Sequence, residues 1–217
     1  SGFYIVDTFG EMRPNDMNRI MHLVDNNLIK SMTLGFHSHN NLQMSYSNAI
    51  SMLQFPTTRN LMLDSSIMGM GKGAGNLNTE LLLEHLNTFY NKNYNIAPLL
   101  EVIDKVINQI HSEFYWGYAP EYYLSSANHC TPSYASHFYN KHMLPIEQVG
   151  ELLSLIPEEK RISFDQTFAE ELYRELLLVP LHSPHSSIIS YQMHRLQECD
   201  SFFQNNRPSC FLCKPDI

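Results

Sequence analysis

The sequence predicts an α/β fold with a parallel sheet, either a barrel or a doubly wound sheet, followed by a run of helices. Short apolar segments end at the polar residues Asp7, His37 and Asp64, at intervals of about thirty residues, and a helix pattern follows each of them. That period is typical of parallel β/α units. From Pro98 onward helix patterns follow one another with no strand between them, which indicates a helical bundle or cap packed on the β/α part.

The β/α part is expected to hold three strands, at residues 3–6, 33–36 and 60–63. The first consists of aromatic and β-branched residues, as expected of a strand that is buried on both faces. Asp16 can cap a helix over residues 17–25, because an aspartate carboxylate accepts hydrogen bonds from the free N–H groups of a first helical turn. A second helix is expected over residues 42–53, and a third after a glycine-rich turn.

The helical part is expected to contain a segment after Pro120 and helices at residues 99–110, 132–142, 145–156 and 164–178. Three of these segments open just after a proline, which fits the first turn of a helix. Beyond residue 178 prolines interrupt a stretch rich in Ser, His and Asn, and an irregular tail is expected. Its Cys210-Phe-Leu-Cys213 stands alone, without the second ligand pair of a structural zinc site.

Composition limits the classes of function. The chain has 217 residues and a net charge of -8, which gives no reason to expect nucleic-acid binding. It has neither an apolar run of membrane-spanning length nor an N-terminal signal sequence. Its four cysteines are sparse and late, so a cytoplasmic, reducing setting is expected. The chain has no initiator Met and runs almost at once into a strand pattern, so it is expected to begin within a domain.

The strongest chemical signal is His37-Ser-His39 at the end of the second strand. Alternate side chains of a strand point to the same side, so the two imidazoles can hold a divalent metal. The alternative is one surface histidine and one hydrogen-bonded core histidine. In parallel β/α folds ligands bind at the carboxyl ends of the strands, where Asp7, the histidine pair and Asp64 all lie. That placement favours metal binding, while Asp64 could also belong to a polar loop that caps the next turn.

The glycine-rich run Gly69–Gly75 lacks the Gly-Lys-Ser/Thr ending of a phosphate loop. Its glycines are expected to permit positive φ angles and a close approach of the backbone to a ligand. Asn76 follows, either as a helix cap or as a contact at the site. The aromatic stretch 116–124 is expected mainly to pack in the core, although a phenol near a metal could act as an acid. Histidines at 129, 137 and 142 have no spacing typical of a metal site and are read as surface or core residues.

Several motifs in a fixed order resemble the DRE-TIM metallolyases, which are metal-dependent (β/α)8 barrels. They are Gly35-Phe-His-Ser-His-Asn-Asn-Leu42, Leu63-Asp-Ser-Ser66, and Gly69-Met-Gly-Lys-Gly-Ala-Gly-Asn76 with Glu80. Gly117-Tyr-Ala-Pro-Glu-Tyr122 is similar to the segment that opens the C-terminal helical domain in the 4-hydroxy-2-oxovalerate aldolase branch. No cysteine occupies the glycine loop, unlike in the lyase branch. The resemblance covers roughly residues 3–177.

The resemblance implies a fold: the C-terminal half of a (β/α)8 TIM barrel at residues 1–97, a helical C-terminal domain at 98–178 and an irregular tail at 179–217. It also implies a site. His37 and His39 would ligate Mn²⁺ or Mg²⁺, Asp64 and Asn76 would bind substrate, and Tyr122 would be the catalytic tyrosine. The Asp-Arg-Glu-type motif of the family's first barrel strand is absent, so this chain alone should hold an incomplete metal site and be inactive.

The implied activity is cleavage of a 4-hydroxy-2-oxo acid to pyruvate and an aldehyde. The implied partners are the small 2-oxo acid substrate, an aldehyde dehydrogenase and further copies of the same chain. One alternative is a Claisen-type acyltransferase of the isopropylmalate synthase branch. Another is a non-catalytic barrel relative that acts as a binding module. An iron oxygenase with two histidines and one carboxylate is disfavoured, because such sites are usually built in β-rich folds.

Overall fold

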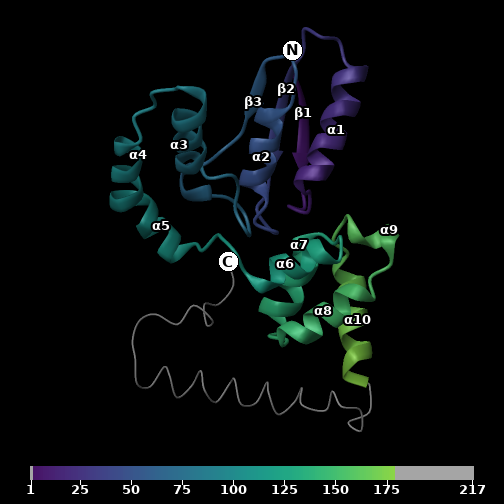
Figure 1. The fold of residues 1–217 in the computed structure, drawn as a ribbon. Helices are drawn as coiled ribbons and strands as arrows, with labels where there is room; N and C mark the ends of the chain where they lie inside the picture. The colour runs from purple at the N-terminus through teal and green to yellow at the C-terminus, as the bar shows by residue number, and fades with distance from the viewer. Residues whose placement is uncertain (1, 179–217) are drawn as a thin grey trace.

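The computed structural model describes residues 2–178, and its first third is a parallel α/β unit (Figure 1). Strands β1 (Gly2–Asp7), β2 (Thr33–Ser38) and β3 (Leu61–Leu63) form one parallel sheet in the order β1-β2-β3. Helices α1 (Pro14–Asn27) and α2 (Ser45–Gln54) connect them. The predicted parallel β/α architecture is confirmed.

The sheet is buried on one face only. Ile5, Leu34 and Phe36 point into a core that α1 and α2 complete with Met17, Met21 and Met52. On the other face Tyr4, Val6 and Met62 are 38%, 51% and 49% exposed. The prediction that the first strand is buried on both faces was wrong, because its alternate side chains have no covering layer among the residues that the structure describes.

Helix α1 begins earlier than predicted because Pro14 starts it. A proline ring fixes φ near the helical value and lacks only an N–H group that the first turn would leave unpaired in any case. The N-cap is Arg13, and Asp16 is the third helical residue, where its carboxylate accepts the Arg13 backbone N–H at 3.1 Å. The prediction of Asp16 as the cap residue was therefore wrong by three positions.

The chain beyond β3 forms a single-turn helix η1 (Ile67–Gly69), helix α3 (Thr79–Tyr90) and a long helical segment. That segment runs as α4 (Ala97–Val102), the π-helical turn η2 (Ile103–Ile107) and α5 (Asn108–Glu113) without a break. Figure 1 shows α3 and α4 on the β3 side of the sheet. The predicted helix over 99–110 exists, with a π-turn at its centre.

Residues 120–178 form helices joined by short loops and pack around a core of their own. The elements are α6 (Pro120–Ala127), α7 (Pro132–Ser136), the π-helical turn η3 (His137–Lys141), α8 (Ile146–Ser154), α9 (Glu158–Arg161) and α10 (Gln166–Leu178). Tyr134, Phe138 and Leu153 are fully buried in this core. Between residues 98 and 178 the structure contains no strand, as predicted. The predicted tail lies outside the described residues.

Hydrogen bonds connect the helical part to the loops that follow the strands. The Ser126 hydroxyl donates to the Phe9 carbonyl at 2.5 Å, and the Trp116 indole N–H donates to the Met68 carbonyl at 2.9 Å. The backbone N–H of Gly117 donates to the Gly73 carbonyl at 3.0 Å. These bonds hold α6 over the carboxyl end of the sheet. A membrane span would need a long apolar helix, and residues 2–178 contain none that qualifies.

Candidate functional site

The histidine pair stands at the carboxyl end of the central strand. His37 lies in β2, and His39 follows the strand directly. Their rings meet edge to face with centroids 5.2 Å apart, and both side chains are partly exposed. Ser38 between them is buried on the opposite face. The two imidazoles therefore lie side by side, as the strand alternation predicts.

Each imidazole is held through its Nδ1 atom. His39 Nδ1 lies 2.6 Å from the Thr8 carbonyl oxygen, which can only accept, so this nitrogen carries the proton. His37 Nδ1 lies 3.3 Å from Asp64 Oδ2. A histidine that engages a carbonyl or carboxylate through one nitrogen presents the other as a lone pair, which is the usual arrangement around a protein-bound metal. The Nε2 atoms of both rings are left for a ligand.

Asp64 follows β3 and its two carboxylate oxygens have separate partners. Oδ2 faces His37, and Oδ1 accepts the Tyr4 hydroxyl at 3.2 Å. A hollow of about 420 Å³ is lined by His37, Leu63, Asp64, Ser65 and Asn76. The structure thus brings Asp64 to the histidine pair rather than using it as a helix cap.

The glycine loop delivers Asn76 to the same hollow. Gly69, Gly73 and Gly75 have φ of 62°, 65° and 80°, as predicted. A Cβ on Gly75 would lie 2.3 Å from the Gly69 carbonyl oxygen, so only glycine fits there. The loop pairs Asn76 with His39 in a backbone bridge.

The side chain of Asn76 has one unused polar atom. Its amide N–H group donates to the Met70 carbonyl at 3.2 Å, whereas Oδ1 is buried and has no hydrogen-bond partner. An unpaired buried acceptor is costly, so this atom is available to a water molecule or a ligand. The N-cap of α3 is Asn78, and the alternative of Asn76 as a helix cap was wrong.

Tyr122 enters a second, larger hollow from α6. This cavity of about 620 Å³ is also lined by His39, Lys72 and His137. Burial raises the pKa of the Tyr122 phenol, and the nearby Glu121 carboxylate adds to the rise, although a hydrogen bond with Ser136 opposes it. The phenol is therefore protonated at neutral pH. His39 thus lines the hollow of Tyr122, whereas His37 lines the hollow of Asp64 and Asn76.

Asp7 is a structural residue rather than a member of the site. It is 3% exposed, and its carboxylate accepts the backbone N–H groups of Glu11 and Met12 at 3.0 and 3.2 Å. Burial raises its pKa, and those two hydrogen bonds oppose the rise. Asp7 fixes the loop after β1, whose Thr8 carbonyl in turn orients His39.

The residues present fit a divalent cation. Two imidazole nitrogens and the unpaired Asn76 oxygen form a mixed nitrogen and oxygen donor set of the kind that first-row divalent ions such as Mn²⁺ accept, and the Asp64 carboxylate holds one of the imidazoles in place. Among residues 2–178, however, no third histidine, cysteine or carboxylate ligand lies close enough to both His37 and His39 to form a group of three with them.

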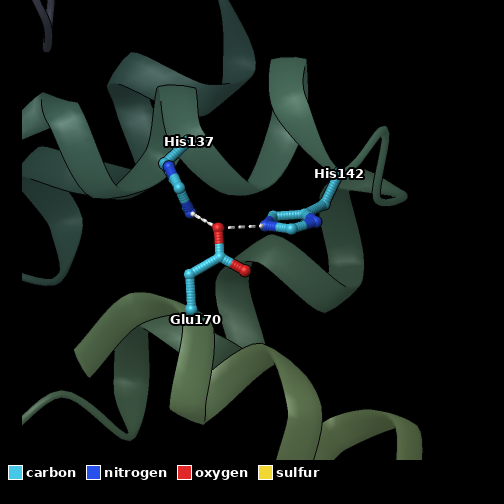
Figure 2. A group of neighbouring side chains, drawn as sticks. All are labelled: His137, His142 and Glu170. Carbon is cyan, nitrogen blue, oxygen red and sulfur yellow. Dashed lines mark ion pairs between the residues drawn. The ribbon is translucent and has the colours of Figure 1, made fainter. Parts of the chain in front are cut away.

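A group of three such ligands does exist elsewhere, and sequence reasoning missed it. His137, His142 and Glu170 converge between η3 and α10 (Figure 2). The prediction of His137 and His142 as surface or core residues did not pair them; the backbone between them is π-helical, and the His142 N–H donates to the His137 carbonyl at 3.4 Å. A π-turn bonds residues five apart and aligns them, whereas an α-helix aligns residues three or four apart. His129 lies elsewhere, 2.8 Å from Glu11.

Comparison with known proteins agrees with the motifs. Residues 1–106 match the family model described as HMGL-like. A 4-hydroxy-2-oxovalerate aldolase of Bacillus thuringiensis is 30% identical over 105 residues, 48% of this chain and 29% of that protein. The protein of the same name from Roseiflexus castenholzii is 28% identical over 155 residues, 71% of this chain and 42% of that protein.

A solved structure is also similar. The N-terminal domain of a candidate aldolase from Bacteroides vulgatus superposes with a TM-score of 0.58 at 30% identity, over 64% of this chain and 44% of that one. The chain spans less than half the length of each of these relatives. The resemblance to the DRE-TIM metallolyases, and to the 4-hydroxy-2-oxovalerate aldolases among them, is confirmed.

Proposed function

We propose, on the premise that residues 1–106 form an HMGL-like lyase segment, that this chain belongs to a divalent-metal-dependent aldolase. The reaction is cleavage of a 4-hydroxy-2-oxo acid to pyruvate and an aldehyde. The relatives that carry the name 4-hydroxy-2-oxovalerate aldolase support this substrate class. The observation that carries the proposal is that His37 and His39 both engage an acceptor through Nδ1 and so present Nε2.

His37 and His39 are the proposed metal ligands, and Asp64 orients the His37 ring. The Asn76 Oδ1 atom, buried without a partner, faces the ligand as a further oxygen donor or as an acceptor for bound water. A divalent cation bound there would supply positive charge opposite the keto and carboxylate oxygens of a 2-oxo acid. Mn²⁺ and Mg²⁺ both suit this donor set.

Tyr122 is the proposed acid. Its phenol holds the proton on Oη at neutral pH, because burial raises its pKa. From the larger hollow, Oη can orient or protonate a substrate oxygen while the 2-oxo acid end lies towards His39. Lys72 lines the same hollow and provides a positive charge for an anionic substrate.

The proposed architecture is the C-terminal half of a (β/α)8 barrel at residues 1–97, followed by a helical domain at 98–178. The exposed side chains on the His37 face of the sheet support it, since Tyr4, Val6 and Met62 would face the interior of a closed barrel. The proposed whole protein closes this barrel with further strands, which would also complete the coordination of the metal.

The test uses the protein that contains this chain, supplied with Mn²⁺ and 4-hydroxy-2-oxovalerate. Pyruvate should form, and His37→Ala should abolish its formation, whereas His22→Ala on the exposed surface of α1 should not. Consumption of an acyl-CoA without cleavage of the hydroxy acid would identify an acyltransferase instead. Metal and 2-oxo acid binding without either reaction would identify a non-catalytic binding module.

A further inference from the structure

A second cluster of ligand groups lies in the helical part, where α10 passes the end of η3. Figure 2 shows His137, His142 and Glu170 pointing at one another. The Nε2 atoms of His137 and His142 lie 3.2 and 3.3 Å from the same carboxylate oxygen, Glu170 Oε1. The three side chains are 8%, 12% and 24% exposed. Three ligand atoms therefore meet at a largely buried point.

Both rings are fixed in place by aromatic packing. The His142 ring stacks on Tyr173 with centroids 3.8 Å apart, and the His137 ring lies 5.3 Å from that of Phe164. The Nε2 atom of His137 is buried, and its contact with Glu170 Oε1 at 3.2 Å is an ion pair without good hydrogen-bond geometry. A buried nitrogen aimed at an oxygen without a proper hydrogen bond is costly unless something else binds both atoms.

The distances match the edges of a metal coordination polyhedron. Ligand atoms at about 2.0–2.1 Å from a tetrahedral Zn²⁺ ion lie about 3.3–3.4 Å from one another. The two nitrogen-to-oxygen distances agree with that value, and all three ligand atoms lie within 4.8 Å of one another. Two histidines and one glutamate, with a fourth position open, are a common zinc ligand set.

We propose that His137, His142 and Glu170 form a second divalent-metal site, separate from the His37/His39 pair, that binds Zn²⁺ or a similar transition-metal ion. His137 also lines the hollow of Tyr122. The site joins η3 to α10 across the core of the helical part. A bound ion therefore cross-links two elements that are far apart in sequence.

The protonation states suit metal binding. Burial lowers the pKa of both histidines, with the Glu170 carboxylate opposing the fall, so both rings are neutral at pH 7. The Lys141 ammonium group lowers the pKa of Glu170 to about 2, and its carboxylate is charged. Neutral imidazole and ionised carboxylate are the forms that bind metal.

Lys141 competes with a metal ion for the Glu170 carboxylate. Its ammonium nitrogen lies 2.6 Å from Glu170 Oε1, the same oxygen that faces the histidines. The Lys141 side chain is 52% exposed, so it can turn into solvent when a cation takes its place. If the cluster were only a network of ion pairs, Lys141 would stabilise it. In a metal site, Lys141 opposes binding.

The experiment is a calorimetric titration of the 217-residue chain with Zn²⁺ alone. The background carries His37→Ala, His39→Ala, Cys210→Ser and Cys213→Ser, which removes the histidine pair of β2 and the Cys-x-x-Cys pair. One equivalent of Zn²⁺ should bind. Glu170→Gln should weaken binding by at least about tenfold, and the matched control Glu171→Gln, exposed on the same helix, should not.

The Zn²⁺ affinity of Lys141→Gln is a second, independent test. This substitution should tighten Zn²⁺ binding by up to about fivefold, because an exposed competing ion pair is lost. Absence of a Zn²⁺ equivalent in the background, or equal affinities for Glu170→Gln and Glu171→Gln, would overturn the proposal. Circular dichroism shows whether Glu170→Gln folds. If it does not fold, Lys141→Gln is the deciding variant, and Zn²⁺ binding that is unchanged or weaker in Lys141→Gln would overturn the proposal.

Discussion

The His37 Nδ1 atom lies 3.3 Å from Asp64 Oδ2, and this pairing joins the ends of two neighbouring strands. If Asp64 orients a metal ligand, Asp64→Asn should lower the Mn²⁺ affinity of the complete protein about 10- to 100-fold without abolishing binding. Calorimetry measures this. Tyr4→Phe, which removes the partner of the other carboxylate oxygen, is the control and should change affinity little. If Asp64→Asn abolished Mn²⁺ binding as completely as His37→Ala, Asp64 would be a metal ligand itself.

Tyr122→Phe should lower kcat for pyruvate formation by about 10²- to 10⁴-fold, since it removes only the phenolic hydroxyl group, which is the proposed acid. KM should change little, because the ring still fills the hollow. Initial rates at saturating substrate give kcat. The neighbour Tyr123, 46% exposed, provides the matched control as Tyr123→Phe. An unchanged kcat in Tyr122→Phe would remove the tyrosine from the reaction.

Gly75→Ala should destabilise the fold by at least about 1–2 kcal/mol, the cost of a left-handed backbone for a residue with a Cβ. The added carbon would also lie 2.3 Å from the Gly69 carbonyl oxygen and push Asn76 out of place. Urea unfolding measures the loss of free energy. Gly150→Ala is the opposite-sign control: it lies within α8, where the added carbon makes ordinary contacts with Leu124. It should stabilise by about 0.5–1 kcal/mol.

The strands and the histidine pair could be predicted because they depend on local rules. Alternation along a strand places His37 and His39 on one side, and the period of the strands places Asp64 beside them. The positive φ angles of the glycine loop follow from the glycines themselves. These features need no knowledge of distant contacts.

Other features depend on long-range packing and could not be predicted. Asp7 ends a strand as Asp64 does, yet it folds back onto the N–H groups of its own loop. The exposed face of β1 depends on which layer covers it, and a strand pattern does not encode that. His137 and His142 come together only because η3 is π-helical, and Glu170 joins them from a helix that the sequence places far away.

The histidines of the second cluster should make stability depend on pH even without metal. Burial lowers the pKa of His137 and His142 in the folded protein, so below about pH 6.5 the unfolded chain binds protons that the folded chain does not. The free energy of unfolding should therefore fall as pH decreases from 7 towards 5. Urea unfolding in EDTA measures this slope.

Two variants should change the pH dependence of the free energy of unfolding in opposite directions. Replacing both histidines (His137→Gln with His142→Gln) should flatten it, because the groups that bind protons only on unfolding are gone. Glu170→Gln should steepen it at the acid end, since the carboxylate raises both histidine pKa values and its loss lets burial lower them further. A slope that stays the same in the double variant would mean that the two buried rings do not control the acid sensitivity of the helical part.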